Sequence, residues 1–166
     1  ACHIELPEDV AKLKTSKSPL LANRLRRSVP DDKIITEAVE LIRGARSPIV
    51  LAGNGAIRKR SSEQLRVLCE STGIGCLSTF MGKGAIPRNM PQCLYTIGLQ
   101  AKDLPLCAID QSDLVICVGY DLVEYHPRLW NSKAEKRILH IDFLPAEIDA
   151  HYLPTVEIVG DIAHTL

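Results

Sequence analysis

The chain has 166 residues, 46% of them hydrophobic and 24% charged, which is enough for one domain with a substantial core. Its 20 basic and 20 acidic residues cancel, and this balance argues against a general nucleic-acid or membrane-surface binder. No apolar run approaches the ~20 residues of a membrane span, and no signal peptide is visible.

The cysteines and the aromatic residues indicate the kind of protein and the kind of core to expect. The six cysteines lack the spacing of a zinc site or of a disulfide framework, so we expect reduced thiols in a cytoplasmic protein. Cys76 and Cys117 lie inside apolar runs and are expected to act as small hydrophobic side chains. Aromatic residues make up only 4%, which predicts a core of Ile, Leu, Val and Ala.

The first 29 residues are predicted to be the end of a preceding domain followed by a linker. Residues 3–6 alternate polar and apolar like a strand, and the chain starts without Met, as if cut from a longer protein. Residues 11–29 carry six basic residues and no acidic ones. A phosphate-binding arm is one interpretation, but the absence of a helical stripe or interleaved aromatics favours a solvated linker.

Residues 30–166 are predicted to form one domain that opens with a helix and a buried strand. Pro30 and two aspartates suit a helix start, and Gly44 ends the helix. The following segment, residues 48–52, is apolar without alternation, which is typical of a strand buried on both faces of a parallel sheet. Two glycines, Gly53 and Gly55, then end the strand.

The rest of the chain alternates helical and strand patterns. Ser61 and Gln64 fit a capping box for a helix that ends at Gly73. Residues 85–97 are predicted to be loop, and a further helix is expected to open at Gly98. The later strands and the start of a last helix are predicted at residues 75–79, 114–119, 137–142, 156–160 and 161–166.

This alternation predicts an α/β fold, a doubly wound and mainly parallel sheet flanked by helices. Such a fold is Rossmann-like, with the topology of DHS-like NAD/FAD-binding domains. Ligands of these sheets collect at the carboxyl ends of the strands, so the turn Gly53-Asn54-Gly55 is the first place to look for a site.

A standard NAD site is not predicted at that turn. Arg58 stands where the dinucleotide fingerprint has its third glycine, which allows close packing of helix on strand. The second strand ends in Ser78-Thr79, whereas an acid should follow it to hold a ribose hydroxyl.

Two other groups of polar residues follow predicted strands. His140 and Asp142 lie two apart, so their side chains project from the same side, either as a base with its orienting group or as a structural hydrogen-bonded pair. A polar cluster after the third buried strand occupies a position suited to a site, although such loops are commonly polar. Its members are Asp121, Glu124, Tyr125 and His126.

Several motifs, taken in order, resemble the central domain of thiamine diphosphate-dependent enzymes of the acetolactate synthase group. They are PIVLAGNG at 48–55, TFMGKG at 79–84, DLVICVG at 113–119, HID at 140–142 with PAEI at 145–148, and VGDI at 159–162. Residues 4–11 resemble the end of the preceding domain in the same enzymes.

The resemblance implies a parent enzyme with three α/β domains, of which this chain is the middle one. The family's catalytic glutamate and its Gly-Asp-Gly metal motif belong to the other two domains. The parent would use thiamine diphosphate and Mg²⁺ to decarboxylate pyruvate and condense it with a second 2-oxo acid, and it would be a homo-oligomer. Oxalyl-CoA decarboxylase and pyruvate oxidase types are alternatives, and this chain alone is expected to be inactive.

The resemblance also implies positions for a flavin or ADP site. Asp121-Leu122-Val123 replaces the Arg-Phe-Asp that flavin-containing members carry, and a carboxylate there would repel a diphosphate. The chain therefore looks closer to the flavin-free, catabolic type, with a vestigial or weak site, and an FAD- or ADP-binding module is the alternative. The matching positions are Gly53, Asn54, Gly55, Thr79, Phe80, Gly98, Leu99, Gly119, Asp121 and Asp142.

Overall fold

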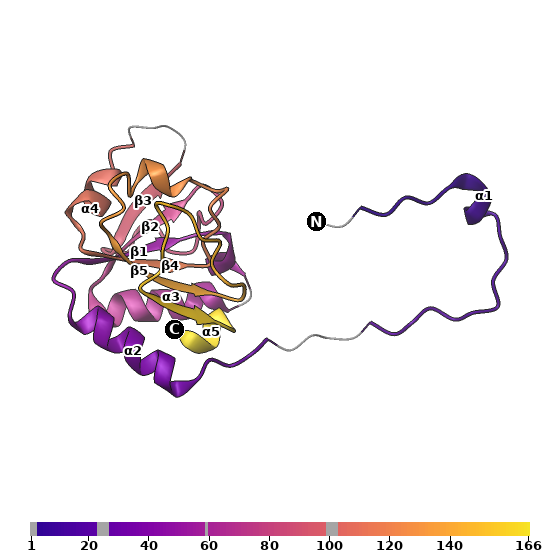
Figure 1. Cartoon of the computed structure of the whole chain (residues 1–166), viewed down its shortest axis with the longest axis horizontal. Helices are drawn as coiled ribbons and strands as arrows, with labels where there is room; N and C mark the ends of the chain where they lie inside the picture. Colours follow the sequence, from indigo (N-terminus) through magenta and orange to yellow (C-terminus); the bar gives the residue numbers. More distant parts are fainter. Residues whose placement is uncertain (1–2, 23–26, 59, 99–102) are drawn as a thin grey trace.

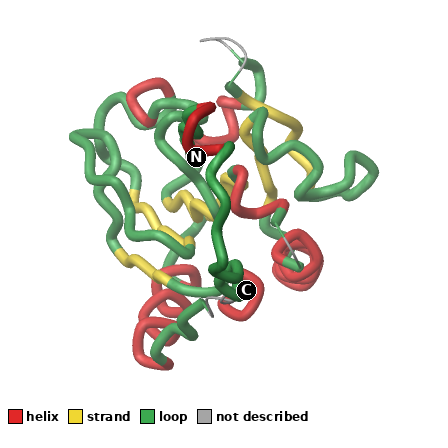
Figure 2. Tube along the Cα trace, turned by 90° about the vertical axis from the view of Figure 1, so that its right-hand side faces the viewer, coloured by secondary structure: helices red, strands yellow, loops and turns green. Residues whose placement is uncertain are grey.

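The computed structural model of the chain describes residues 3–22, 27–58, 60–98 and 103–166. The first of these ranges is an N-terminal arm, residues 3–22, that extends away from the folded domain and contains one short helix, α1 (Glu8–Ala11) (Figure 1). Every residue of the arm is exposed, and in Figure 2 the arm passes in front of the domain. The strand predicted at residues 3–6 is wrong, because alternation produces a strand only where a neighbouring strand supplies hydrogen bonds.

The domain is built on a six-stranded, fully parallel sheet with the strand order β3-β2-β1-β4-β5-β6. The predicted doubly wound fold is thereby confirmed, and the direction of the strand order reverses between β1 and β4. The strands are β1 (Pro48–Ala52), β2 (Gly75–Thr79), β3 (Cys93–Ile97), β4 (Leu114–Val118), β5 (Arg137–Asp142) and β6 (Val156–Val159).

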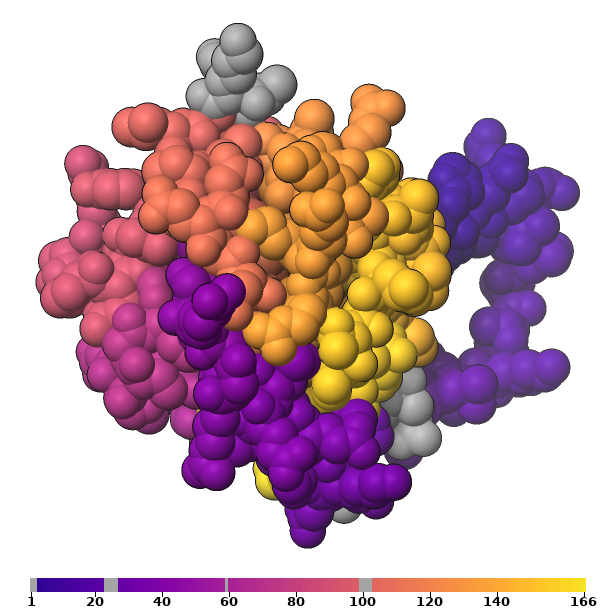
Figure 3. All heavy atoms as spheres, turned by 60° about the vertical axis from the view of Figure 1, so that its left-hand side comes forward, coloured from indigo at the N-terminus to yellow at the C-terminus, as the bar shows by residue number. Residues whose placement is uncertain are grey.

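Helices cover both faces of this sheet. On one face lie α2 (Asp32–Arg43), α3 (Ser61–Thr72) and α5 (Ile162–Thr165), whose apolar side chains join one core. The other face carries α4 (Leu106–Gln111), on the opposite side of the sheet in Figure 1. Figure 3 shows α2 packed beside the C-terminal segment. No helix within the described ranges is long and apolar enough to cross a membrane.

Helix α2 and strand β1 form as their sequence predicts. The Asp31 carboxylate accepts a hydrogen bond from the Lys33 N–H (2.7 Å) and thus caps α2, which ends at Gly44. In β1, Val50 packs in the core beneath α2 and α3, whereas Leu51 packs in the opposite core. The strand lacks alternation because both of its faces are buried.

Two predicted elements differ from the structure, and a third lies largely outside the described residues. Ser61 is the first residue of α3 and is buried, so its hydroxyl does not cap the helix as the predicted capping box requires. Strand β3 lies within residues 85–97, predicted to be loop because Pro87 and Pro91 interrupt them; the strand begins two residues after Pro91 and includes Tyr95 at φ +65°. The helix predicted to open at Gly98 falls on residues 99–102, which lie outside the described ranges, and Gly98 itself has φ +106°; the described helix α4 begins after Pro105, whose φ of −62° suits a helix start.

Aromatic side chains contribute more to the core than their low frequency predicts. Three of the four tyrosines and the single tryptophan are buried on the α4 face of the sheet. Tyr120 contacts both Trp130 and Tyr152, with ring centroids 6.0 and 5.5 Å apart. These rings fill the space beneath the loops that follow β4 and β5, where the chain has no long helix within the described ranges.

Candidate functional site

The turns that follow β1 and β4 meet at the point where the strand order reverses. The Gly53 N–H donates to the Val118 carbonyl (2.9 Å), and the Gly55 N–H donates to the Gly119 carbonyl (2.7 Å). Gly119 has φ +58°, and a Cβ atom on it would lie 2.4 Å from the Ala56 nitrogen. The close approach of the two backbones explains the glycines, because Gly53 itself has an ordinary φ of −100°.

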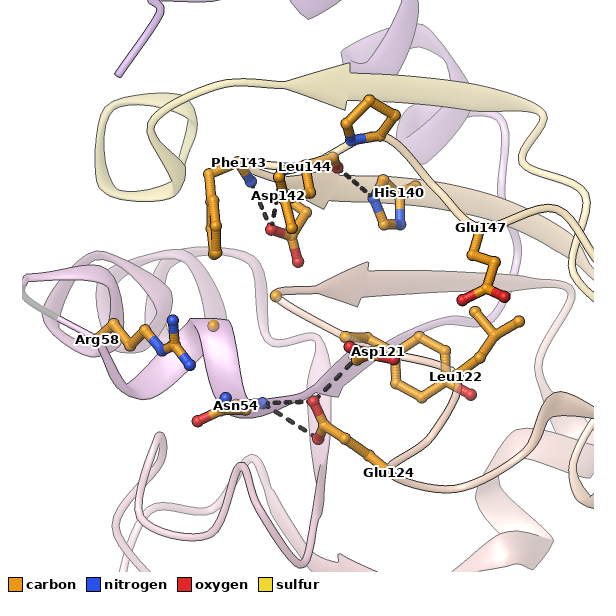
Figure 4. A pocket seen from close by; sticks show the side chains of 14 residues that line it. Asn54, Arg58, Asp121, Leu122, Glu124, His140, Asp142, Phe143, Leu144 and Glu147 are labelled. Atoms are coloured by element: carbon orange, nitrogen blue, oxygen red, sulfur yellow. Dashed lines mark hydrogen bonds between the residues drawn. The ribbon is translucent and has the colours of Figure 1, made fainter. Parts of the chain in front are cut away.

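A pocket of about 430 Å³ opens at the carboxyl ends of β1, β4 and β5. Figure 4 shows its side chains, with Arg58 and Glu147 at opposite ends. Five of the positions that the resemblance assigns to a flavin or ADP site line it, namely Asn54, Gly55, Gly119, Asp121 and Asp142.

Glu124 is only 3% exposed, and its carboxylate accepts hydrogen bonds from backbone N–H groups at the glycine turn and after β4. It accepts hydrogen bonds from the Asn54 N–H at 3.0 and 3.1 Å and from the Asp121 N–H at 3.3 Å (Figure 4). The Thr79 hydroxyl donates to its second oxygen. Glu124 thus connects the ends of three strands, a role that its place in the polar cluster after β4 did not reveal.

His140 and Asp142 do not form the predicted pair. The His140 Nε2 lies 3.2 Å from the Leu144 carbonyl, and its Nδ1 lies 2.8 Å from the Tyr152 hydroxyl. Because a carbonyl only accepts, Nε2 donates, and in the neutral ring Nδ1 accepts from Tyr152. The Asp142 carboxylate instead accepts from the Phe143 N–H (2.5 Å) and the Leu144 N–H (3.2 Å), while burial raises its pKa.

The charge of the pocket does not fit a diphosphate-bearing cofactor such as a flavin dinucleotide or thiamine diphosphate. Its described lining has one basic side chain, Arg58, against the four carboxylates of Asp121, Glu124, Asp142 and Glu147. Those carboxylates would repel phosphate oxygens. The Asn54 N–H, a backbone donor at the turn, already donates to Glu124.

The turn also lacks the helix geometry of a dinucleotide site. A 3₁₀-helix, η1 (Asn54–Ile57), follows Gly53, and α3 begins only at Ser61. The N-terminus of the α-helix therefore does not continue directly from the glycine turn, as it does where a pyrophosphate binds.

Of the remaining predicted positions, those that the structure describes are not part of the pocket lining. Thr79 is buried beneath it, against Glu124. The Phe80 ring is 42% exposed and lies beside Gly98, which has φ +106° and donates its N–H to the Asp103 carboxylate (2.7 Å). Leu99 lies outside the described residues. Among the described residues, no group of three or more His, Cys, Asp or Glu side chains is arranged to hold a metal ion.

Comparison with known proteins identifies the family. The sequence profile of the thiamine pyrophosphate enzyme central domain matches residues 35–166. The chain belongs to this family. The chain is 30% identical over its full length to an acetolactate synthase of Bacillus subtilis (strain 168). It is 33% identical over 98% of its length to the catabolic acetolactate synthase of Raoultella terrigena.

The central domain spans less than a third of these relatives, 30% and 29% of their lengths. Among solved structures, it is similar to the X-ray structure of an enzyme from Mycobacterium smegmatis assigned as thiamin diphosphate-dependent. The TM-score is 0.70 at 18% identity, covering 89% of the central domain and 29% of the other chain. At this identity, the likeness supports the fold.

Proposed function

We propose that this chain is the non-catalytic central domain of a cytoplasmic, homo-oligomeric acetolactate synthase-like enzyme. The parent uses thiamine diphosphate and Mg²⁺ to decarboxylate pyruvate and condenses the product with a second 2-oxo acid. The relatives that cover the chain almost end to end carry this proposal, since they are acetolactate synthases. The cofactors belong to the other domains of the parent.

The proposed non-catalytic role is supported by how the polar groups at the strand ends are used. Glu124 bonds to the turn after β1, Asp142 bonds to the loop after β5, and His140 bonds to Tyr152 and Leu144. Each of these side chains holds neighbouring chain in place. A general base needs a lone pair directed at substrate, and both ring nitrogens of His140, both carboxylate oxygens of Glu124 and the Oδ1 of Asp142 already bond to the protein.

The proposed flavin-free character is supported by the position of Glu124. Where a flavin's diphosphate would need backbone donors, the buried carboxylate already accepts the Asn54 N–H. A carboxylate and a phosphate compete for the same donor, and their like charges add to the penalty. The domain would then act as a structural unit of the parent rather than as a nucleotide carrier.

Assays of the purified parent and of this chain test the proposal. With pyruvate, thiamine diphosphate and Mg²⁺, the parent is expected to form acetolactate at the same rate with and without added FAD, and this chain alone is expected to form none. Oxygen consumption with pyruvate would instead identify a pyruvate oxidase, and turnover of oxalyl-CoA would identify an oxalyl-CoA decarboxylase.

Ligand binding tests the alternative of an FAD- or ADP-binding module. The pocket volume of about 430 Å³ is within the range of ligand sites, and Arg58 could meet one phosphate. Calorimetry of this chain and of the parent with FAD and ADP is expected to show no heat. A saturable isotherm that is lost in Arg58→Met would support the alternative and contradict the flavin-free assignment.

A further inference from the structure

Three cysteine thiols converge where α3, β2 and β3 meet. Cys69 and Cys76 are buried in the core beneath α3, and Cys93 packs against the same core while remaining partly exposed. The interaction of the Cys69 and Cys76 thiols lowers the pKa of Cys69 and raises that of Cys76, and the Cys76 thiol donates to the Leu77 carbonyl (3.5 Å). Cys76 and Cys93 are register partners in adjacent parallel strands.

The register places Cys76 and Cys93 within reach of a disulfide. Neighbouring strands lie about 4.7–4.9 Å apart, and disulfides join Cα atoms about 4.4–6.8 Å apart. Paired residues of parallel strands project from the same face of the sheet, and both thiols contact the same apolar core. The cross-link would tie the edge strand β3 to its single neighbour in the sheet.

A second pocket, of about 490 Å³, has both residues in its lining, and solvent reaches Cys93, which is partly exposed, whereas Cys76 is 1% exposed. Lys83 and Arg88 also line it, and its described lining contains no acidic side chain. Because Cys93 is partly exposed and Cys76 is buried, Cys93 is the thiol that meets an oxidant first, and the interaction with Cys69 together with burial raises the pKa of Cys76. By contrast, Cys117 is buried on the opposite face of the sheet.

We propose that Cys93 and Cys76 form an oxidation-dependent cross-link between β3 and β2. Hydrogen peroxide oxidises the Cys93 thiol to a sulfenic acid, its O–O bond breaks, and one water leaves. The Cys76 sulfur then attacks the Cys93 sulfur, the S–O bond breaks, and the departing oxygen takes the Cys76 proton to leave as a second water. A thiol reductant reverses the cross-link.

Peptide mapping of the intact chain tests this cross-link. After brief exposure to peroxide and alkylation, we expect a linked peptide pair containing Cys76 and Cys93, lighter by two hydrogens and absent after reduction. Cys76→Ser should leave a Cys93 sulfenic acid that dimedone traps, and Cys93→Ser should abolish the cross-link. Cys117→Ser is the matched control and should leave its yield unchanged.

Other patterns of oxidation overturn the proposal. Oxidation confined to the exposed Cys107, or Cys93 oxidised to sulfinic acid while Cys76 remains alkylatable, shows that the pair does not cross-link. Thermal melting of the wild type provides a readout that needs no variant. Peroxide should raise Tm and reductant should restore it, because the cross-link restrains the unfolded chain. An unchanged or lowered Tm counts against the cross-link.

Discussion

At the scale of single residues, Glu124 is the side chain that accepts the backbone hydrogen bond available at the strand-end pocket. The sequence directs attention to Asp121 as the carboxylate that would repel a diphosphate, and Asp121 does line the pocket. Glu124 is the one that occupies the turn, because it is buried and directed at the Asn54 N–H. The two acids are separated by two residues, and only the folded backbone shows that the turn between them places Glu124 beneath the pocket.

Replacing Glu124 is expected to destabilise the domain. Glu124→Ala leaves the partly buried N–H of Asn54 and the buried Thr79 hydroxyl without this acceptor, which should lower the free energy of unfolding by about 3 kcal/mol. Glu124→Gln keeps one acceptor oxygen and should lose less. Urea denaturation measures both, and the exposed Glu147→Ala in the same pocket is the control. Equal losses for Glu124→Ala and Glu147→Ala would contradict this role of Glu124.

Gly119 provides a second prediction at this scale. Gly119→Ala combines a left-handed backbone with a Cβ atom 2.4 Å from the Ala56 nitrogen, so it should lower the unfolding free energy by roughly 3 kcal/mol. Gly73→Ala is the matched control, because Gly73 has φ +74° with open space around it and should lose only about 1 kcal/mol. Chemical denaturation that finds both variants equally stable would show that backbone contact does not require Gly119.

At the scale of elements, the starts of β1, β4 and β5 are connected through Asp113. Its carboxylate accepts from the Arg46 N–H (3.0 Å) and the Ser47 N–H (2.9 Å) and pairs with Arg137 (3.1 Å). The two backbone hydrogen bonds, more than Arg137, lower the pKa of Asp113 below its ordinary 3.8. One carboxylate thus aligns the starts of three strands, at the edge of the sheet opposite the pocket.

The lowered pKa of Asp113 predicts a pH dependence. A carboxylate with a lower pKa in the folded state stabilises fully above its ordinary pKa of 3.8, and this contribution is lost as pH falls through the folded-state value. The stability difference between wild type and Asp113→Asn should therefore be constant near neutral pH and shrink below 3.8. Denaturation at several pH values measures it, with the exposed Asp110→Asn as control. A difference that persists in acid would contradict the assignment.

At the scale of the whole molecule, residues 28–30 join the domain although the arm before them is exposed. The Ser28 carbonyl accepts the Asp161 N–H (2.9 Å), and Pro30 packs against Gly160. Arg27 lies 4.6 Å from the centre of the Phe143 ring at the edge of the pocket. On these contacts we propose that the folded unit starts a few residues before residue 30, the boundary predicted from the sequence.

Truncation tests where the folded unit begins. Removing residues 1–22 should leave Tm unchanged, because residues 3–22 are exposed, whereas removing residues 1–30 should lower it by deleting the Ser28 and Pro30 contacts. Trypsin should cut first at Lys12, Lys14 and Lys17. Differential scanning calorimetry and mass spectrometry of the digests provide the measurements. Equal melting temperatures for the two truncations would place the boundary later.

The sequence by itself determined the parallel sheet and its family. Buried strands such as β1 and β4 carry unbroken apolar runs, and glycines or aspartates at their ends mark the site edge, so local pattern and tertiary environment agree. Edge strand β3 was missed because two prolines, Pro87 and Pro91, precede it and indicate a loop, although the strand begins two residues after Pro91.

Only the tertiary structure decided how the polar residues are used. His140 and Asp142 share a side of their strand, yet their partners, Tyr152 and the loop after β5, come from packing between distant segments. Glu124 reaches the β1 turn from 70 residues away. Hydrogen-bond partners of this kind depend on distances between separate elements, and residue types along one chain do not encode those distances locally. The glycine turn is therefore predictable from the sequence, whereas the carboxylate that fills it is not.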